Sequence, residues 1–199
     1  MGTTPTLVAL PADQPIWSRF FTVAPLVLVA TKEGDGWDVA PKHMAMPLGW
    51  DNYYGFVCSP RHSTYDNVRR HGAFTVSFPG PDQIVQTSLA ASGRDPEGGK
   101  PGLEALPTFP ATAVEGVLVS GCGLYLECEL DRIVDGFGEN CLIAGRVVAA
   151  QADERALRVH DRDDADLVHA APLLAYVSPG RFASVSETFS FPFHADFSL

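Results

Sequence analysis

The stretch from Gly55 to Pro79 reads GFVCSPRHSTYDNVRRHGAFTVSFP and contains a strand, a helix and a second strand in close succession. The apolar run Tyr53 to Cys58 ends at a Ser-Pro pair, and proline stops a strand because it lacks an N–H donor. Ser63, with an acidic residue three positions later, predicts a capped helix start, and Gly72 predicts the helix end. We therefore predict a short helix from Thr64 to His71.

A short loop rich in hydrogen-bond donors joins this strand to this helix. Its polar side chains are Ser59, Arg61, His62, Ser63 and Thr64. Hydroxyls, a permanent cation and the amides of a helix start suit a phosphate, because the positive end of the helix dipole points at the ligand. The plainer alternative is that Ser63 only caps the helix and that Arg61 is solvated. Spacing alone leaves both interpretations open.

The order of these features resembles the flavin reductase-like family, the FMN-binding split barrels that include flavoredoxin. In that family a strand ends in a short loop with Arg and Ser or Thr, followed by Thr-x-x-Asn, a small helix and a strand of the type F-x-V-x-x-P. The matching residues here are Arg61, Thr64, Asn67, Phe74, Val76 and Pro79. Two later strands of the family are matched by Leu126, Cys128, Gly145 and Val147. The resemblance covers residues 20 to 190.

The resemblance implies one FMN per subunit and a set of residues around it. The segment Met44 to Pro47 corresponds to the part of the family that lies along the isoalloxazine ring, although methionines in an apolar segment are more commonly core-filling side chains. Cys58 lies at the mouth of the phosphate loop. If Arg61 does not hold the phosphate, Lys42 or Arg94 is the next candidate. The expected cofactor-binding residues are Met44, Ala45, Met46, Pro47, Cys58, Ser59, Arg61, His62, Ser63, Thr64 and Asn67.

The implied activity is electron or hydride transfer through the flavin. NAD(P)H reduces FMN, or bound FMN passes electrons to a small-molecule or protein acceptor. Because the ring does the redox chemistry and the protein supplies placement and hydrogen bonds, no catalytic side chain and no metal is expected. The alternative is a non-enzymatic flavin-binding protein or electron carrier without intrinsic NAD(P)H activity. The sequence leaves open whether the flavin is a bound cofactor or a substrate.

Hydrophobic patterning predicts a mainly β fold in a single domain over residues 1–199. The resemblance to the flavin reductase-like family implies that this fold is a split β-barrel with Greek-key topology, with about six antiparallel strands and two or three short helices. Residues 124–131 alternate apolar and polar side chains, which predicts a half-buried strand with Glu127 on its polar face. A second helix, Gln83 to Ser92, is expected with Asp82 as its cap. The other expected strands are Phe20–Thr31, Trp37–His43, Cys141–Ala150 and, as the last strand, Leu173–Val177.

Three segments lie outside this pattern. Residues 1–19 form a proline-rich arm that extends over the domain or into a partner. Residues 93–113 form a long loop, which is either a lid over the flavin or a surface excursion. Residues 186–199 form an aromatic tail, with four phenylalanines that need cover from a second subunit or from the flavin ring. Because both ends of the chain need cover, we expect a homodimer.

Composition and charge exclude several classes of protein. The net charge of −10 and the absence of a basic cluster disfavour binding to nucleic acid or to an anionic membrane. The longest apolar run, Val23 to Ala30, is too short to span a bilayer, and no signal peptide is apparent, so we expect a cytoplasmic protein. The four cysteines form no C-x-x-C pair and are expected as buried thiols. The acidic run Asp161 to Asp166 is expected as a charged turn rather than a metal site.

Overall fold

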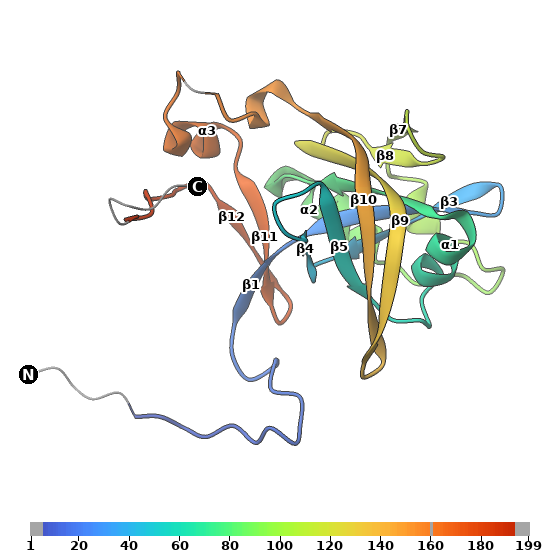
Figure 1. Cartoon of the computed structure of the whole chain (residues 1–199), viewed down its shortest axis with the longest axis horizontal. Coiled ribbons are helices and arrows are strands. Elements are labelled where there is room, and N and C mark those ends of the chain that lie inside the picture. Colours follow the sequence, from blue (N-terminus) through green and yellow to red (C-terminus); the bar gives the residue numbers. More distant parts are fainter. Residues whose placement is uncertain (1–5, 160, 194–199) are drawn as a thin grey trace, which may run out of the picture.

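A curled antiparallel sheet of seven strands forms the body of the protein (Figure 1). The structure is a computed structural model that describes residues 6–159 and 161–193. Along the sheet the strands follow the order β3-β2-β6-β9-β10-β5-β4. Their bounds are β2 (Val27–Glu33), β3 (Gly36–Lys42), β4 (Ala45–Pro47), β5 (Tyr53–Cys58), β6 (Ala73–Phe78), β9 (Leu124–Phe137) and β10 (Asn140–Ala152).

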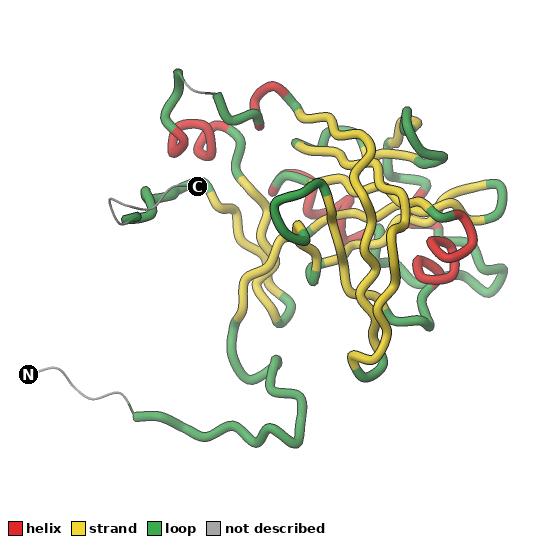
Figure 2. Tube along the Cα trace, viewed as in Figure 1, coloured by secondary structure: helices red, strands yellow, loops and turns green. Residues whose placement is uncertain are grey.

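Two smaller sheets and several short helices surround the seven-stranded sheet (Figure 2). One sheet, in the order β1-β11-β12, consists of β1 (Thr22–Pro25), β11 (Leu173–Ser178) and β12 (Arg181–Val185). The other pairs β7 (Thr108–Pro110) with β8 (Val117–Val119). The helices are α1 (Ser63–His71), α2 (Ile84–Leu89) and α3 (Asp164–Ala170), with 3-10 turns at Pro81–Gln83, Pro101–Leu103 and Glu154–Ala156. In the described part of the chain, no helix combines the length and the apolar character needed to cross a membrane.

The sheet closes on itself at the junction of β3 and β4. These strands lie at opposite ends of the strand order, yet only His43 and Met44 separate them in sequence. The sheet must therefore curl until its two edges meet, and we call this junction the seam. The interior is a single apolar core in which the Phe56 and Phe74 rings meet edge to face at 5.2 Å. These features confirm the prediction of a mainly β split barrel with short helices.

β2 is buried on both faces, which explains its continuous apolar run. Val27 and Val29 point into the barrel core, whereas Leu28 and Ala30 belong to a second core outside the barrel. The segment from α2 to β8 supplies much of that second core, including Leu106 and Val119, and Val39 of β3 and Cys122 also belong to it. A strand covered on both sides carries no polar face.

Several sequence-based expectations about elements were wrong in detail. The expected strand Phe20–Thr31 is two strands, because the chain changes sheets after Pro25. A further strand, β12, follows the expected last strand. The second helix is shorter than expected and begins after a 3-10 turn that contains Asp82, so Asp82 is not its cap. Glu127 is buried rather than solvent-facing, with only 1% of its surface exposed.

Other expectations about local structure were confirmed. The expected strand Trp37–His43 forms a hairpin with the strand before it, and the turn consists of the two residues Gly34 and Asp35. All four cysteines are free and buried. The acidic run is exposed and begins α3, where the Asp163 carboxylate accepts a hydrogen bond from the Ala165 N–H at 2.8 Å.

The two ends of the described chain project from the barrel (Figure 1). Residues 6–21, which we call the arm, precede β1 without forming a helix or strand and expose several large apolar side chains. The tail after β12 exposes Phe189, Phe191 and Phe193, and the expected Phe197 lies outside the described residues. The expected loop 93–113 contains a 3-10 turn and β7.

Candidate functional site

The fold brings the two predicted halves of the site together at the seam. β4 pairs with β5 so that Ala45 lies opposite Phe56, and the Val57 N–H donates to the Met44 carbonyl at 2.8 Å. Ala45 is buried, whereas Met44 and Met46 each expose 56% of their surface. Pro47 is also exposed. The methionines are therefore not core-filling side chains. They form an open apolar surface beside the strand that leads into the predicted phosphate loop.

Lys42 is a buried cation at this seam. It is the last residue of β3, with 9% of its surface exposed. Its Nζ lies 3.6 Å from the Cys58 Sγ and 5.9 Å from the centroid of the Phe56 ring. Within the described ranges, no carboxylate forms an ion pair with Lys42. A buried ammonium without a counter-ion is costly, so this position suits an anionic ligand.

Helix α1 begins beside Lys42 without a side-chain cap. The N-cap position is His62, in extended conformation, and its side chain accepts no hydrogen bond from the first turn. The predicted Ser63 cap was wrong, because Ser63 lies one residue inside the helix. The predicted end was right, since Gly72 adopts the left-handed conformation with φ of 69°. The Tyr65 N–H donates to the His62 carbonyl at 2.9 Å, so the Ser63 and Thr64 amides are the first-turn donors that could attract an anion.

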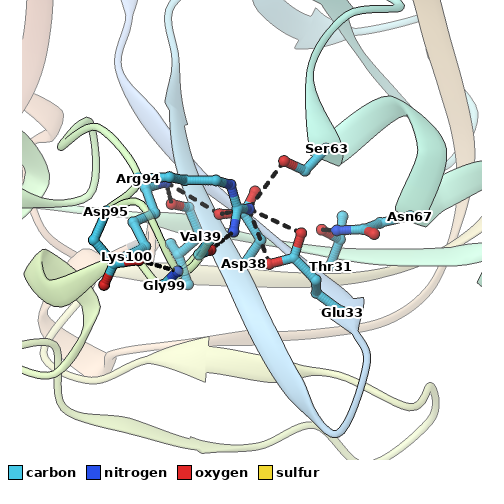
Figure 3. A network of polar contacts seen from close by, with 11 residues as sticks. Thr31, Glu33, Asp38, Val39, Ser63, Asn67, Arg94, Asp95, Gly99 and Lys100 are labelled. Carbon is cyan, nitrogen blue, oxygen red and sulfur yellow. Dashed lines mark hydrogen bonds and ion pairs between the residues drawn. The ribbon is translucent and has the colours of Figure 1, made fainter.

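A network of polar contacts ties the 93–113 loop to this helix start (Figure 3). The Arg94 guanidinium donates to the Ser63 Oγ at 2.9 Å and to the Glu33 carboxylate at 2.8 Å. Lys100 donates to Asp38 at 3.1 Å and to the Val39 carbonyl at 2.6 Å. The start of the loop is therefore fastened to the β2–β3 hairpin and forms one border of the site.

Arg61 and Ser59 lie on the outer side of the loop. Arg61 exposes 75% of its side chain and pairs with Glu139, near the tip of the β9–β10 hairpin, at 2.7 Å. The Arg61 N–H donates to the Ser59 Oγ at 3.3 Å. An ion pair this exposed contributes little free energy, so a phosphate could displace Glu139. In the structure, however, the guanidinium is directed toward the hairpin.

Thr64 and Asn67, the motif residues on α1, face inward. Both are buried, and the Asn67 Nδ2 donates to the Thr31 Oγ1 on β2 at 3.1 Å (Figure 3). Asn67 therefore positions α1 against the barrel. Its side-chain amide therefore already has a hydrogen-bond partner inside the fold.

The pKa values of two histidines near the seam lie below the usual value for histidine. Burial, and then the neighbouring charge of Lys42, lower the pKa of both His43 and His62. A lowered pKa favours the neutral form of His62, which can donate or accept a hydrogen bond in the loop. The His43 ring also stacks on Tyr176 of β11 with ring centroids 4.4 Å apart, which holds the three-stranded sheet close to the seam.

The sequence alone did not reveal the central place of Lys42 or the contacts of Arg94. The sequence feature that could have pointed to Lys42 is its position as a charged residue at the end of an apolar strand. Arg94 lies in a glycine-rich loop without periodicity, so no local pattern connects it to Ser63. Both residues had been named only as substitutes for Arg61.

Comparison with known proteins gives one family match and several similar structures. Residues 18–176 match the family described as flavin reductase like domain. Flavoredoxin from Methanosarcina acetivorans has a TM-score of 0.77 at 16% identity, covering 96% of this chain and 97% of that chain. The 2-nitrobenzoate 2-nitroreductase of Pseudomonas fluorescens has a TM-score of 0.79 at 17% identity, covering 98% and 99%. A search of the curated proteins found no match.

An FMN-binding protein from Thermus thermophilus, solved with bound 1-cyclohex-2-enone, is also similar. Its TM-score is 0.72 at 21% identity, covering 96% of this chain and 99% of that chain. At identities this low, the solved structures show the similarity of fold alone.

Proposed function

This chain belongs to the flavin reductase-like family, and from that premise we propose that it is a flavin-dependent oxidoreductase that binds FMN at the barrel seam. The observation that carries the proposal is the uncapped start of α1 beside the buried Lys42 ammonium, for which the described residues 6–159 and 161–193 provide no carboxylate partner. A phosphate there would provide the missing negative charge and accept hydrogen bonds from the first-turn amides.

The residues around the seam fit the parts of FMN. Lys42, the α1 amides and the hydroxyl of Ser63 would hold the phosphate, with Arg94 behind Ser63 and with Ser59, Arg61 and His62 at the outer edge. The exposed surface of Met44, Met46 and Pro47 would support the apolar ring, and the backbone of β4 and its neighbours would supply polar contacts. Cys58 and Thr64 would form the inner wall.

The bound flavin would supply electron or hydride transfer, with NAD(P)H as the proposed donor and a small molecule or a protein as acceptor. The protein's own residues would bind and orient the ring. Two similar structures, named a nitroreductase and an NADH:FAD oxidoreductase, support an enzymatic role.

A second candidate is an electron carrier without NAD(P)H activity. β4 lies at the edge of the sheet with Met44 and Met46 exposed, so a ring held there remains accessible to a partner protein. The proposed homodimer rests on the exposed apolar side chains of the arm and the tail.

Spectroscopy of the purified protein tests the proposal. With FMN added, the protein should show a perturbed flavin absorption spectrum, and anaerobic NADH or NADPH should bleach it. Bleaching by neither nucleotide, with FMN still bound, would favour the electron carrier. A flavin spectrum identical to that of free FMN at high protein concentration would contradict flavin binding.

A further inference from the structure

A large apolar cleft lies apart from the seam, at the rim of the barrel. Its volume is about 830 Å³, and we call it the rim cleft. β1 forms one wall, the end of β6 and the start of β9 form the opposite wall, and the start of β11 and the end of β12 complete it. The lining includes Val23, Pro25, Phe78, Leu124, Leu173 and Leu174.

The rim cleft is uncovered in a single copy of the chain. Val23 and Leu173, which line it, expose 72% and 58% of their surface. Its charged lining residues are Asp82, Asp153 and Arg155. Asp153 and Arg155 pair with each other at 2.8 Å, so this pair offers little attraction to an ionic ligand. An apolar hollow of this kind is typical of an interaction surface.

The arm presents the apolar surface that matches the rim cleft. Leu7, Val8, Trp17 and Phe21 are 63–89% exposed. The contacts of the arm are local: the Arg19 N–H donates to the Ile16 carbonyl at 2.9 Å, and the Trp17 ring meets Phe20 at 6.0 Å. In the described part of the chain, no side chain of residues 6–21 forms a hydrogen bond or ion pair with the barrel.

The course of the arm points to a second copy rather than to its own barrel. Figures 1 and 2 show the arm leaving β1 and running outward, away from the seven-stranded sheet. The arm is also continuous with β1, one wall of the rim cleft. In a two-fold dimer in which the β1 walls of the two rim clefts are adjacent, each arm begins beside the partner's cleft. The sixteen residues of an extended arm can reach about 50 Å.

We propose that the rim cleft receives the arm of a second copy of this chain, so that two copies exchange arms in a symmetric dimer. Six apolar side chains on each arm would become buried: Leu7, Val8, Leu10, Trp17, Phe20 and Phe21. Aromatic side chains bury roughly 150–250 Å² each, so two reciprocal arms supply area on the order of the 1,200–2,000 Å² of a stable interface. The inference rests on the proposed homodimer and not on flavin binding.

Light scattering on full-length variants tests whether the arm holds the dimer. The wild type should have twice the mass of one chain, and the double variant Trp17→Asp with Phe21→Asp should have the mass of one chain at micromolar concentration. The comparison variant is Phe189→Asp with Phe191→Asp, which changes two exposed aromatic residues in the tail and should leave more of the dimer intact than the arm variant does. A monomeric wild type, or a comparison variant that dissociates while the arm variant does not, would overturn the proposal.

Cross-linking tests where the arm binds. Trp17 is replaced by p-benzoyl-phenylalanine in ¹⁵N-labelled protein, which is mixed with unlabelled protein and illuminated. Mass spectrometry should then find labelled arm peptides joined to unlabelled peptides that contain Val23 or Leu173. Cross-links within one copy, to another surface, or none at all would overturn the assignment of the rim cleft. A mixture that cross-links as predicted but fails to bind FMN would contradict the proposed function alone.

Discussion

At the scale of single residues, Lys42 carries most of the phosphate proposal. Lys42→Met keeps the length of the side chain and removes the charge. If Lys42 contacts the phosphate, its loss should weaken FMN binding by about 1.5–3 kcal/mol, which is about ten- to a hundredfold, and change riboflavin binding much less. Because a buried cation without a counter-ion is costly, apoprotein stability should stay the same or rise.

Arg61→Ala is the matched control for Lys42→Met. The exposed Arg61 already has Glu139 as a partner, so its removal should weaken FMN by less than the loss of Lys42. Isothermal titration of both variants with FMN and riboflavin measures the four affinities. If Arg61→Ala has the larger effect on the FMN-to-riboflavin ratio, the phosphate lies on the outer side of the loop.

Glu127 shows how burial of a carboxylate can be compensated. Its oxygens accept hydrogen bonds from the N–H groups of Thr112, Ala113 and Val114, at 2.5–3.1 Å, and from the Thr112 hydroxyl. Burial acts to raise the pKa of Glu127, but these hydrogen bonds together outweigh it, so the pKa lies below its usual value. The carboxylate fastens the end of the 93–113 loop to β9.

The stability contributed by Glu127 should depend on pH. Its pKa is lower in the folded protein than in the unfolded chain, so the contribution is present above about pH 4.3 and is lost as the pH falls through the folded-state pKa. Glu127→Gln should lower the free energy of unfolding at pH 7 by about 2–4 kcal/mol, because its amide cannot accept all of these bonds. The difference from wild type, measured by urea unfolding, should shrink below pH 4.

Glu129→Gln provides the comparison on the same strand. Glu129 is exposed in its pair with Arg146, so its replacement should change stability by about 0–1 kcal/mol. Equal effects of the two substitutions on the free energy of unfolding would show that the backbone N–H groups around Glu127 do not stabilise the fold specifically.

At the scale of elements, the end of α1 depends on Gly72. Its φ of 69° is strained for any residue with a Cβ, so Gly72→Ala should destabilise the fold by about 1–2 kcal/mol. Gly93→Ala is the control, because Gly93 has open space around it and no positive φ. Thermal unfolding of the two variants should separate them by several degrees; identical midpoints would contradict the assigned C-cap.

The sequence predicted helices and strands well where a single residue type determines where the element begins or ends. The β5–α1–β6 run followed from a proline that stops the strand and a glycine that ends the helix. The prediction failed where two residues compete for one role, as His62 and Ser63 do at the helix start. It also failed for Glu127, because alternation shows that a side chain faces away from the core but not that a distant loop covers that face.

At the scale of the whole molecule, the curl of the sheet creates the candidate site. Lys42 and Cys58 lie on strands that are not neighbours in the sheet order, and only closure at the seam brings the ammonium to the thiol. Arg94 reaches Ser63 from a loop that the barrel fold places alongside α1. Local sequence patterns hold no information on such contacts, which is why the strand, loop and helix around the proposed site were predictable and the contacts of Lys42 and Arg94 were not.

The central claim is that the protein recognises FMN through its phosphate at the start of α1. Titration of the wild-type apoprotein with FMN and, separately, with riboflavin tests it most directly, because the two ligands differ only in that phosphate. Several charge-assisted hydrogen bonds, reduced by solvent exposure, should favour FMN by about 2–4 kcal/mol, or at least about thirtyfold in Kd. Equal affinities for the two flavins, or no binding of either, would contradict the claim.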